Sequence, residues 1–358
     1  MSKDHWQRYP KVGKHPSLRS WLEYLRIERK LASDTLAIYA RSLEDYLAFH
    51  ERFAPQAPLE RAGPEVIIAY RDDLLRREPY TARGVRRRTG PEGLAPGTAG
   101  LRLNVIRLYY DHLRDRGDTD QNPVDPVFSS AQLWAYRQTG RFADGGAAAD
   151  RWLPTVEEWQ RFLGVAAWKS IRTRTMLALA YDAALRREEL VALELADLDW
   201  EGRRLTVRAK TTKRRETRHV PYSAITARLL EEYRLVHRDT PVLAPTAALF
   251  ISESNRTRGR PLSPIMWSKI VQGLAEEADL PRISTNTLRH RRLAQLAGAG
   301  LPLEELAPYL GHHSSQRAAP YYRLGARADP VDDRLDVHER PADDLAVLLG
   351  VGARHRAQ

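Results

Sequence analysis

Four short clusters in the second half of the chain gather side chains that can act on a phosphate ester. In chain order they read YDAALRREELVALELADLD, LTVRAKTTKRRETRHVPYS, STNTLRHRRLAQL and LAPYLGHHSSQRAAPYYR. Arginine suits phosphate because its planar guanidinium group can donate two hydrogen bonds at once, and lysine can supply a proton. The phenol of tyrosine becomes a nucleophile when its proton is removed. These residue types therefore indicate chemistry at a phosphate.

The composition narrows the classes of site that the chain could contain. The chain has no cysteine, which excludes disulfide bonds, thiolate metal sites and thiol nucleophiles. No carboxylate cluster or HExxH segment has metal-binding spacing, so neither a metal nor another cofactor is expected. The formal net charge of +11 is carried mostly by arginine and favours a nucleic-acid partner. The polar N-terminus and the lack of an apolar run of about 20 residues predict a cytoplasmic protein with no membrane segment.

Taken in this order, the four clusters resemble the tyrosine recombinase (phage integrase) family over about residues 152–324. The first cluster is similar to the family pattern TGLRxSELxxLxxxDID, which implies that Arg186 is a catalytic arginine and Glu189 a buried supporting acid. The second is similar to the hairpin pattern VxGKGxKxRxVPL, which implies that Lys210 protonates the departing 5′ oxygen of DNA. Because this hairpin is about two residues longer than the common form, Lys213 remains an alternative, or a phosphate contact.

The third cluster resembles the family pattern HxLRHTFAT, with one departure. The match makes Arg289 the second catalytic arginine, with His290 directly after it. Asn286 stands where the family has a histidine. Asparagine can donate a hydrogen bond to a phosphate oxygen, but it cannot carry a proton or a charge. We therefore expect the site to stay active, with an uncharged hydrogen-bond donor in place of the family's histidine.

The fourth cluster resembles the family pattern xxLGHxSxxxTxxYxH. The histidine after Gly311 matches His312, and the family's tyrosine nucleophile lies nine residues later, which gives Tyr321. Counting from His313 gives Tyr322 instead. We prefer Tyr321, because a GHHS segment with its first histidine in the motif is a familiar variant.

The resemblance implies a site-specific recombinase or integrase that cleaves and rejoins double-stranded DNA. Two arginines would neutralise the phosphate while the tyrosine attacks, which gives a 3′-phosphotyrosine and a free 5′-hydroxyl. The family acts as a tetramer on two DNA sites. Asn286 supports one alternative, a catalytically weak member that acts as a DNA-binding structural or regulatory factor. The others are a type IB topoisomerase and an unrelated basic helical DNA-binding module.

Two domains are predicted to position these residues, because 358 residues are too many for one hydrophobic core of ordinary size. Apolar stripes predict four helices in the first, similar to the SAM-like core-binding domain of the family, over residues 14–128. This domain includes a basic loop in which Arg86, Arg87 and Arg88 are expected to contact DNA. Residues 129–150 read as a linker, because the segment GRFADGGAAAD is small and lacks periodicity.

The second domain is predicted over residues 151–328 as a helical α+β catalytic domain. A capping box of Thr155 and Glu158 opens its first helix, and Leu190, Leu193 and Leu195 predict a later one. Alternating residues around 201–221 predict a β-hairpin. The whole chain is therefore expected to be mainly α with a small β-sheet. Residues 329–358 form a polar tail with one short amphipathic piece, which would pack on a neighbouring subunit or on its own domain: Leu345, Val347, Leu348 and Leu349.

Overall fold

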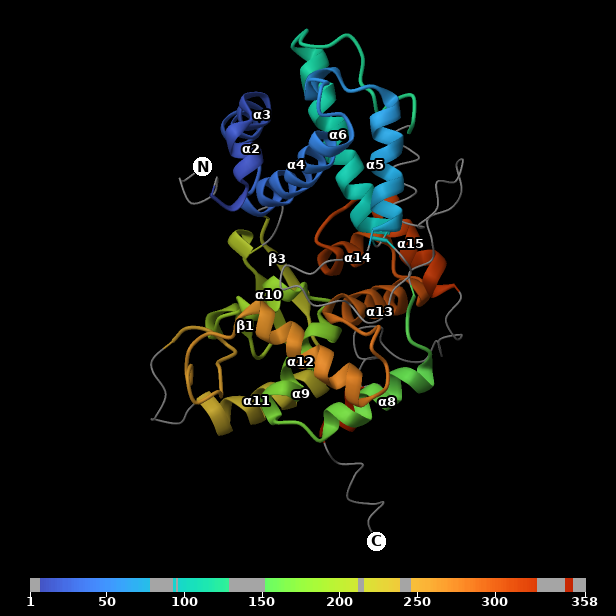
Figure 1. Ribbon diagram of the computed structural model, residues 1–358. Coiled ribbons are helices and arrows are strands. Elements are labelled where there is room, and N and C mark those ends of the chain that lie inside the picture. The colour runs from blue at the N-terminus through green and yellow to red at the C-terminus, as the bar shows by residue number, and fades with distance from the viewer. Residues whose placement is uncertain are drawn as a thin grey trace. The chain divides into compact units, whose positions relative to one another are not determined.

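The computed structural model divides the chain into two compact units, residues 1–149 and 150–358, which are taken separately below (Figure 1). The residues that it describes are 7–77, 93–94, 96–128, 152–211, 216–238, 246–326 and 345–349. The basic loop with Arg86, Arg87 and Arg88, Lys213 and the linker 129–150 lie outside these ranges. Within them, no helix has both the length and the apolar character needed to cross a membrane.

The first unit is built from helices only, over the part that the structure describes. They are α2 (Pro10–Lys14), α3 (Pro16–Ile27), α4 (Ser33–Phe53), the 3₁₀ turn η1 (Leu59–Arg61), α5 (Pro64–Arg76) and α6 (Pro96–Asp115). The four helices expected from the sequence are α3 to α6, and α2 is an additional short one. The apolar stripe of α3 is buried, as its spacing predicts: Leu18, Trp21, Leu22 and Leu25.

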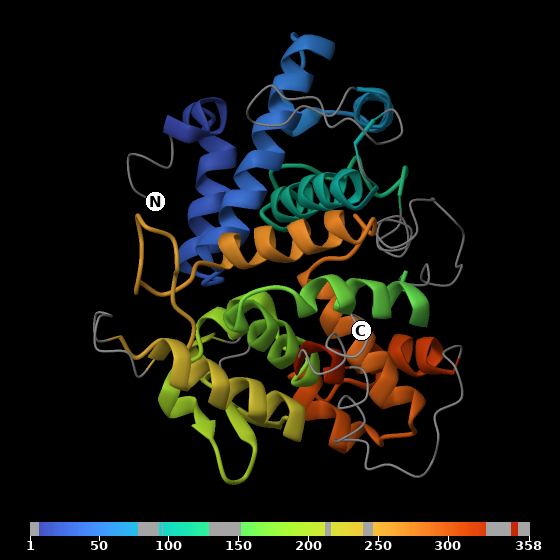
Figure 2. The ribbon, with the colours of Figure 1, turned by 90° about the horizontal axis from the view of Figure 1, so that it is seen from below.

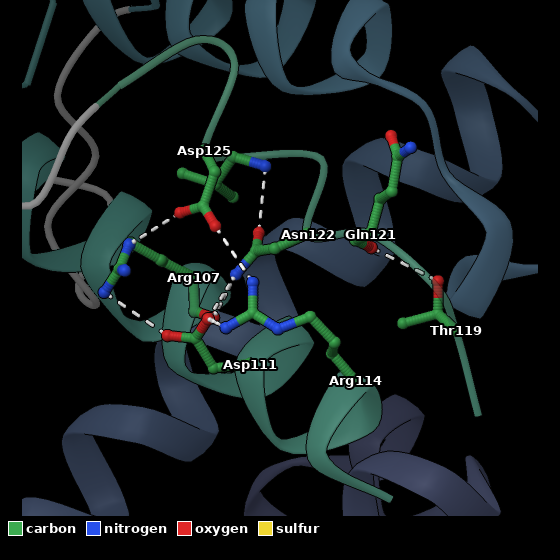
Figure 3. A network of polar contacts seen from close by, with 8 residues as sticks. Arg107, Asp111, Arg114, Thr119, Gln121, Asn122 and Asp125 are labelled. Carbon is green, nitrogen blue, oxygen red and sulfur yellow. Dashed lines mark hydrogen bonds and ion pairs between the residues drawn. The ribbon is translucent and has the colours of Figure 1, made fainter. Parts of the chain in front are cut away.

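A polar network fixes the chain that follows α6 (Figure 3). The Asn122 side chain donates hydrogen bonds to the Arg107 carbonyl oxygen (2.9 Å) and to Asp111 (3.0 Å), and accepts one from the Val124 N–H (2.9 Å). Asp125 receives the guanidinium groups of Arg107 and Arg114 from the same helix. Residues 119–128 are thus fastened to α6 at the end of the first unit.

The second unit is mainly helical and carries a small sheet, which confirms the fold class expected from the sequence. Its helices are α8 (Val156–Ala167), α9 (Ile171–Asp182), α10 (Arg187–Val191), α11 (Ala224–Tyr233), η4 (Arg234–Arg238), α12 (Pro264–Glu277), α13 (Thr285–Gly298), α14 (Leu303–Leu310) and α15 (Ser315–Gly325). The expected capping box of Thr155 and Glu158 opens α8. The helix expected through Leu195 ends earlier, at Val191, because the backbone of Leu193 and Leu195 pairs with residues 247–249.

The sheet is an antiparallel meander that includes the predicted hairpin. Its strands are β1 (Leu198–Asp199), β2 (Arg204–Val207) and β3 (Arg218–Pro221), in that order. Short 3₁₀ turns precede β1 and follow β2: η2 (Leu195–Asp197) and η3 (Ala209–Thr211). In the register of β2 and β3, Val207 lies opposite Arg218. Arg218 is thus the first residue of β3, directly after the turn of the hairpin.

The central helix of the second unit is α9, in which every residue from Ile171 to Asp182 except Arg174 is buried. A helix that is buried on nearly all of its surface must lie in the core, here among α8, α11 and α13. Helix α13 also packs closely on α15. The segment that leaves α9 at Asp182 therefore emerges from a fixed position in the core.

One piece of the C-terminal tail packs on the same chain. The 3₁₀ turn η5 (Ala346–Leu349) lies beside α8 and α11, as the short red segment of Figure 2 shows. Leu345 and Leu348 are fully buried, and the Leu348 carbonyl accepts a hydrogen bond from Arg174 of α9 (2.6 Å). Packing of this piece on a neighbouring subunit stays a prediction.

Candidate active site

A sharp turn after α9 sets the position of Arg186. The N–H groups of Ala184 and Leu185 donate to the carbonyls of Tyr181 and Ala180 (both 3.0 Å), which is the pattern of a Schellman C-cap. Ala184 takes a left-handed conformation there, with φ of 47°, although such positions favour glycine. Arg186 follows as the N-cap residue of α10. Its side chain is 29% exposed, so it leaves the core at the surface of the unit.

Glu189 is the carboxylate around which two arginines are arranged. Its side chain is only 1% exposed, and it accepts hydrogen bonds from the Arg186 N–H (2.9 Å) and guanidinium group (2.8 Å). The Arg218 guanidinium group binds both carboxylate oxygens, at 3.2 and 2.8 Å. Burial raises the pKa of the Glu189 carboxyl, but Arg218 and then Arg186 outweigh it and lower the pKa to about 2. Glu189 therefore stays ionised and holds both guanidinium groups.

The C-terminal carbonyl groups of α14 hold three arginines. The Leu310 carbonyl oxygen accepts from both Arg186 (3.2 Å) and Arg289 (2.8 Å), and the Pro308 carbonyl accepts from the Arg218 Nε (2.7 Å). Carbonyls at a helix C-terminus lack partners within the helix and carry partial negative charge, which suits guanidinium groups. The next residue, Gly311, has φ of 64°, and a Cβ there would lie 3.2 Å from Arg186 Nη1.

Arg289 lies deepest in this cluster. It comes from α13, is 5% exposed, and also donates to the Ala184 carbonyl in the turn before Arg186. Burial, followed by the nearby charge of Arg186, lowers the pKa of the Arg289 guanidinium to about 10. The group is still protonated at neutral pH. Two cationic side chains from distant parts of the sequence are thus fixed against one carbonyl oxygen.

The two candidate tyrosines of α15 have different partners. The Tyr321 hydroxyl lies 2.9 Å from His290 Nδ1, and its side chain is 5% exposed. His290 is the residue next to Arg289 on α13, and α13 packs on α15, so Tyr321 lies close to the segment that carries Arg289. The Tyr322 hydroxyl instead donates to the Leu301 carbonyl (2.7 Å). Burial and Glu304 raise the pKa of the Tyr322 phenol.

The remaining residues expected at the site lie around this cluster. Asn286 is exposed in the first turn of α13. His312 is half-buried after Gly311, with its Nδ1 accepting from the Ser314 N–H (3.3 Å). A cavity of about 160 Å³ opens here, and its walls include Arg218, Gly311 and His312.

Lys210 lies apart from the arginine cluster, in the turn η3 after β2. Its side chain is 69% exposed, and its Nζ is 3.8 Å from Glu194 Oε1. An exposed pair at this separation holds a lysine only weakly. The structure therefore leaves Lys210 on the surface of the hairpin and brings together Arg186, Glu189, Arg289 and Tyr321.

A buried ion pair lies behind the arginines, and the sequence patterns did not indicate it. Arg292 is 0% exposed and Asp182 1% exposed, with Arg292 Nη2 3.7 Å from Asp182 Oδ1. Arg292 Nε also donates to the Asp182 carbonyl (3.2 Å). The other Asp182 oxygen accepts from the Ser223 N–H (2.6 Å) and the Thr226 hydroxyl (2.8 Å). The pair joins the end of α9 to α13, and so links the two segments that carry Arg186 and Arg289.

Arg218 and His290 are further residues of the site to which the sequence analysis gave no role. The hairpin pattern VxGKGxKxRxVPL contains an arginine that falls on Arg218, so a signal for it was present. For His290 the sequence gives its place after Arg289, but not its contact with Tyr321. Within the described ranges, no group of three or more histidine and carboxylate side chains could hold a metal ion.

Comparison with known proteins shows which proteins this chain is similar to. A model of the phage integrase family matches residues 154–327, and one of the phage integrase N-terminal SAM-like domain matches residues 18–90. Tyrosine recombinase XerC of Mesorhizobium japonicum is 30% identical over 297 residues, which cover 82% of this chain and 86% of that protein. Tyrosine recombinase XerD of Caulobacter vibrioides is 28% identical, over 82% of this chain and 87% of that protein.

Solved structures share the fold at lower identity. The lambda integrase(75–356) dimer bound to a COC′ core site has a TM-score of 0.61 and 18% identity, over 89% of this chain and 95% of that one. The Tn1549 transposon integrase (residues 82–397 of that protein) in complex with circular intermediate DNA has a TM-score of 0.60 and 15% identity, over 84% of this chain and 92% of that one. The family matches and the relatives confirm the resemblance found in the sequence, and the chain belongs to the phage integrase family of tyrosine-type site-specific recombinases.

Proposed function

We propose that this recombinase cleaves DNA with Tyr321 as its nucleophile and with Arg186 and Arg289 bound to the scissile phosphate. One observation carries the proposal: these two arginines, from different helices, donate to the same Leu310 carbonyl, and the Tyr321 hydroxyl lies 2.9 Å from His290, the residue next to Arg289. A phosphate that bridges the two guanidinium groups would thus have a phenol beside it. Tyr322 is the less suitable nucleophile, because its hydroxyl is bonded to Leu301.

The first chemical step exchanges one phosphodiester bond for another. The Tyr321 oxygen attacks phosphorus, the bond to the 5′ oxygen breaks, and a 3′-phosphotyrosine and a free 5′-hydroxyl remain. Charge develops on the non-bridging oxygens in this step, and fixed positive groups stabilise it because they need no reorganisation. Glu189 and Arg218 contribute by fixing Arg186. Since the bond energy is retained, another 5′-hydroxyl can reverse the reaction and join a different strand without ATP.

The other expected residues complete the proposed site. Lys210, exposed on the hairpin, protonates the departing 5′ oxygen, with Lys213 as the alternative or as a phosphate contact. His312 and Asn286 donate hydrogen bonds to phosphate oxygens, and Asn286 does so without a proton to exchange.

DNA binding and assembly belong to the same proposal. Double-stranded DNA is the partner, and the excess of basic residues supplies affinity that falls with salt. Arg86, Arg87 and Arg88 contact its backbone from a core-binding domain over residues 14–128, which the linker 129–150 joins to a catalytic domain over residues 151–328. A tetramer on two DNA sites carries out the exchange in the cytoplasm.

A nicked suicide substrate tests the nucleophile. The duplex carries the cognate site, selected from a random pool by binding, and its nick lets the cleaved strand diffuse away so that the covalent complex accumulates. We expect a covalent protein–DNA band from the wild type and from Tyr322→Phe, and none from Tyr321→Phe. Loss of the band only with Tyr322→Phe would transfer the role to Tyr322. A wild type that binds this site and forms no band would favour a DNA-binding factor without catalysis.

Relaxation of supercoiled DNA separates the recombinase from a type IB topoisomerase. We expect covalent complexes only at the selected site. Relaxation of plasmids that lack the site, at a similar rate, would favour the topoisomerase.

A further inference from the structure

The contact between His290 and Tyr321 involves the oxygen atom that would attack DNA. His290 Nδ1 lies 2.9 Å from the Tyr321 hydroxyl, and the two rings are 5.8 Å apart between centroids. A neutral imidazole with its proton on Nε2 accepts a hydrogen bond at Nδ1. In that tautomer the geometry is one in which the phenol proton points at a base.

His290 lies on α13 one helical turn after Asn286. Asn286 and His290 are four residues apart, and such residues lie on the same face of a helix, one turn from each other. Asn286 occupies the position where the first motif histidine was expected, and an amide cannot accept a proton. A group that can take a proton is therefore present one turn further along the same face.

We propose that His290 is a further catalytic residue, which takes the proton of Tyr321 as the phenol attacks. This inference rests on the proposed function of Tyr321. In the step, the O–H bond of Tyr321 breaks and an N–H bond forms at His290 Nδ1, while the phenol oxygen bonds to phosphorus. The bond from phosphorus to the 5′ oxygen breaks, and that oxygen takes its proton from Lys210. His290 becomes an imidazolium. When a 5′-hydroxyl attacks the phosphotyrosine, its proton passes to Lys210, the bond from phosphorus to the Tyr321 oxygen breaks, and His290 returns its proton to that oxygen.

Histidine is better suited to accept the proton of Tyr321 than Arg289, the other group considered near the phenol. A tyrosine phenol has an ordinary pKa near ~10, so little phenolate forms at neutral pH without a base. Arg289 stays protonated, since its pKa is lowered only to about 10, and it can stabilise a phenolate but not accept its proton. The proton acceptor identified by geometry is therefore the imidazole bonded to the hydroxyl.

A substrate with a 5′-bridging sulfur at the scissile phosphate distinguishes a base from an acid. A thiolate leaves without protonation, so a variant that lacks the general acid recovers on this substrate, whereas one that lacks the base does not. The test variant is His290→Asn, in which the amide oxygen takes the place of Nδ1 but cannot accept a proton. We expect its cleavage rate to fall by about 10²–10⁴-fold on both the oxygen and the sulfur substrate. Lys210→Ala should fall on the oxygen substrate and recover on the sulfur one.

The matched control is His112→Asn. His112 lies on α6 in the first unit, where its ring stacks on that of Tyr24 (4.8 Å between centroids), so the exchange removes a histidine–tyrosine contact away from the phenol of Tyr321. We expect this variant to cleave like the wild type. His290→Gln is measured in parallel in case His290→Asn does not fold, and DNA affinity and thermal unfolding are recorded for every variant.

A second experiment changes the acidity of the phenol at position 321 and measures the effect of His290→Asn again. With 3-fluorotyrosine at position 321 the phenol is more acidic, so the loss caused by His290→Asn should shrink. A merely structural role of His290 would leave this loss unchanged.

The outcomes distinguish a failure of the proposed role of His290 from a failure of the proposed role of Tyr321. A rate for both His290 variants within threefold of the wild type, with a covalent band that still depends on Tyr321, would overturn the role of His290 alone. Recovery of His290→Asn on the sulfur substrate would also overturn it, because His290 would then act on the leaving group. A wild type without any covalent band would overturn both proposals.

Discussion

Replacement of Glu189 with glutamine removes the one charge that holds Arg186 and Arg218 together. The ordinary pKa of the carboxyl is 4.5 and its value in the folded chain is about 2, and this difference corresponds to about 3 kcal/mol of stability. Because the folded-state pKa is depressed, that contribution is present above pH 4.5 and is lost as the pH falls towards 2. At pH 7 we expect Glu189→Gln to lower the free energy of unfolding by about 3 kcal/mol. For a unit of this size that means a Tm about 6–12 °C lower.

The assay is urea and thermal unfolding of the full chain over a pH series. Glu188→Gln is the matched control, since Glu188 is the exposed neighbour and its ion pair with Arg187 should contribute less than about 1 kcal/mol. The difference between wild type and Glu189→Gln should narrow as the pH is lowered below 4.5, because the wild-type carboxyl becomes protonated. A difference below about 1 kcal/mol at pH 7, or one that stays constant into acid, would refute the reasoning. We also expect slower DNA cleavage by Glu189→Gln, since Arg186 loses its support.

Two further predictions concern the segment that carries Arg186. Ala184→Gly should stabilise the chain by about 0.5–1 kcal/mol in urea unfolding, because Ala184 has φ of 47°; Ala183→Gly, at φ of −86°, should not stabilise it. Equal effects of the two exchanges would contradict this account. Asp182→Ala should cost about 3–5 kcal/mol, because it removes the buried carboxylate beside Arg292, and Arg292→Met in the same chain should recover part of that loss. Strictly additive effects in this double-mutant cycle would show that the two side chains are not coupled.

Local signals in the sequence predicted most of the elements correctly. The stripe of α3, the capping box of α8 and the hairpin of β2 and β3 each depend on residues within a few positions of one another. The sequence assigned Glu189 to the site only through the family resemblance, although Arg186 and Glu189 are three residues apart and meet on one helical turn. The end of α10 was placed too late, because a pairing of Leu193 with residues near 249 overrides the local apolar pattern.

Contacts between segments that are distant in the sequence could not be predicted from those local signals. The common partner of Arg186 and Arg289 is a backbone carbonyl, which no side-chain pattern identifies. The pairing of His290 with Tyr321 depends on how α13 packs on α15, and the buried Arg292 runs against the expectation that arginine lies at the surface. Even the choice between Tyr321 and Tyr322, which spacing left open, acquired a physical basis only from their different hydrogen-bond partners.

The sequence by itself determined the family, the helical class of both parts and the side chains available for chemistry, because residue type, order and local spacing are written along the chain. The tertiary structure decided which of those side chains meet. It brings Glu189, Arg218 and the end of α14 around Arg186, leaves Lys210 exposed, and places a histidine beside one tyrosine. The physical reason is that hydrogen bonds and ion pairs act over a few ångströms in space, and only the packing of the helices decides which distant residues come within that range.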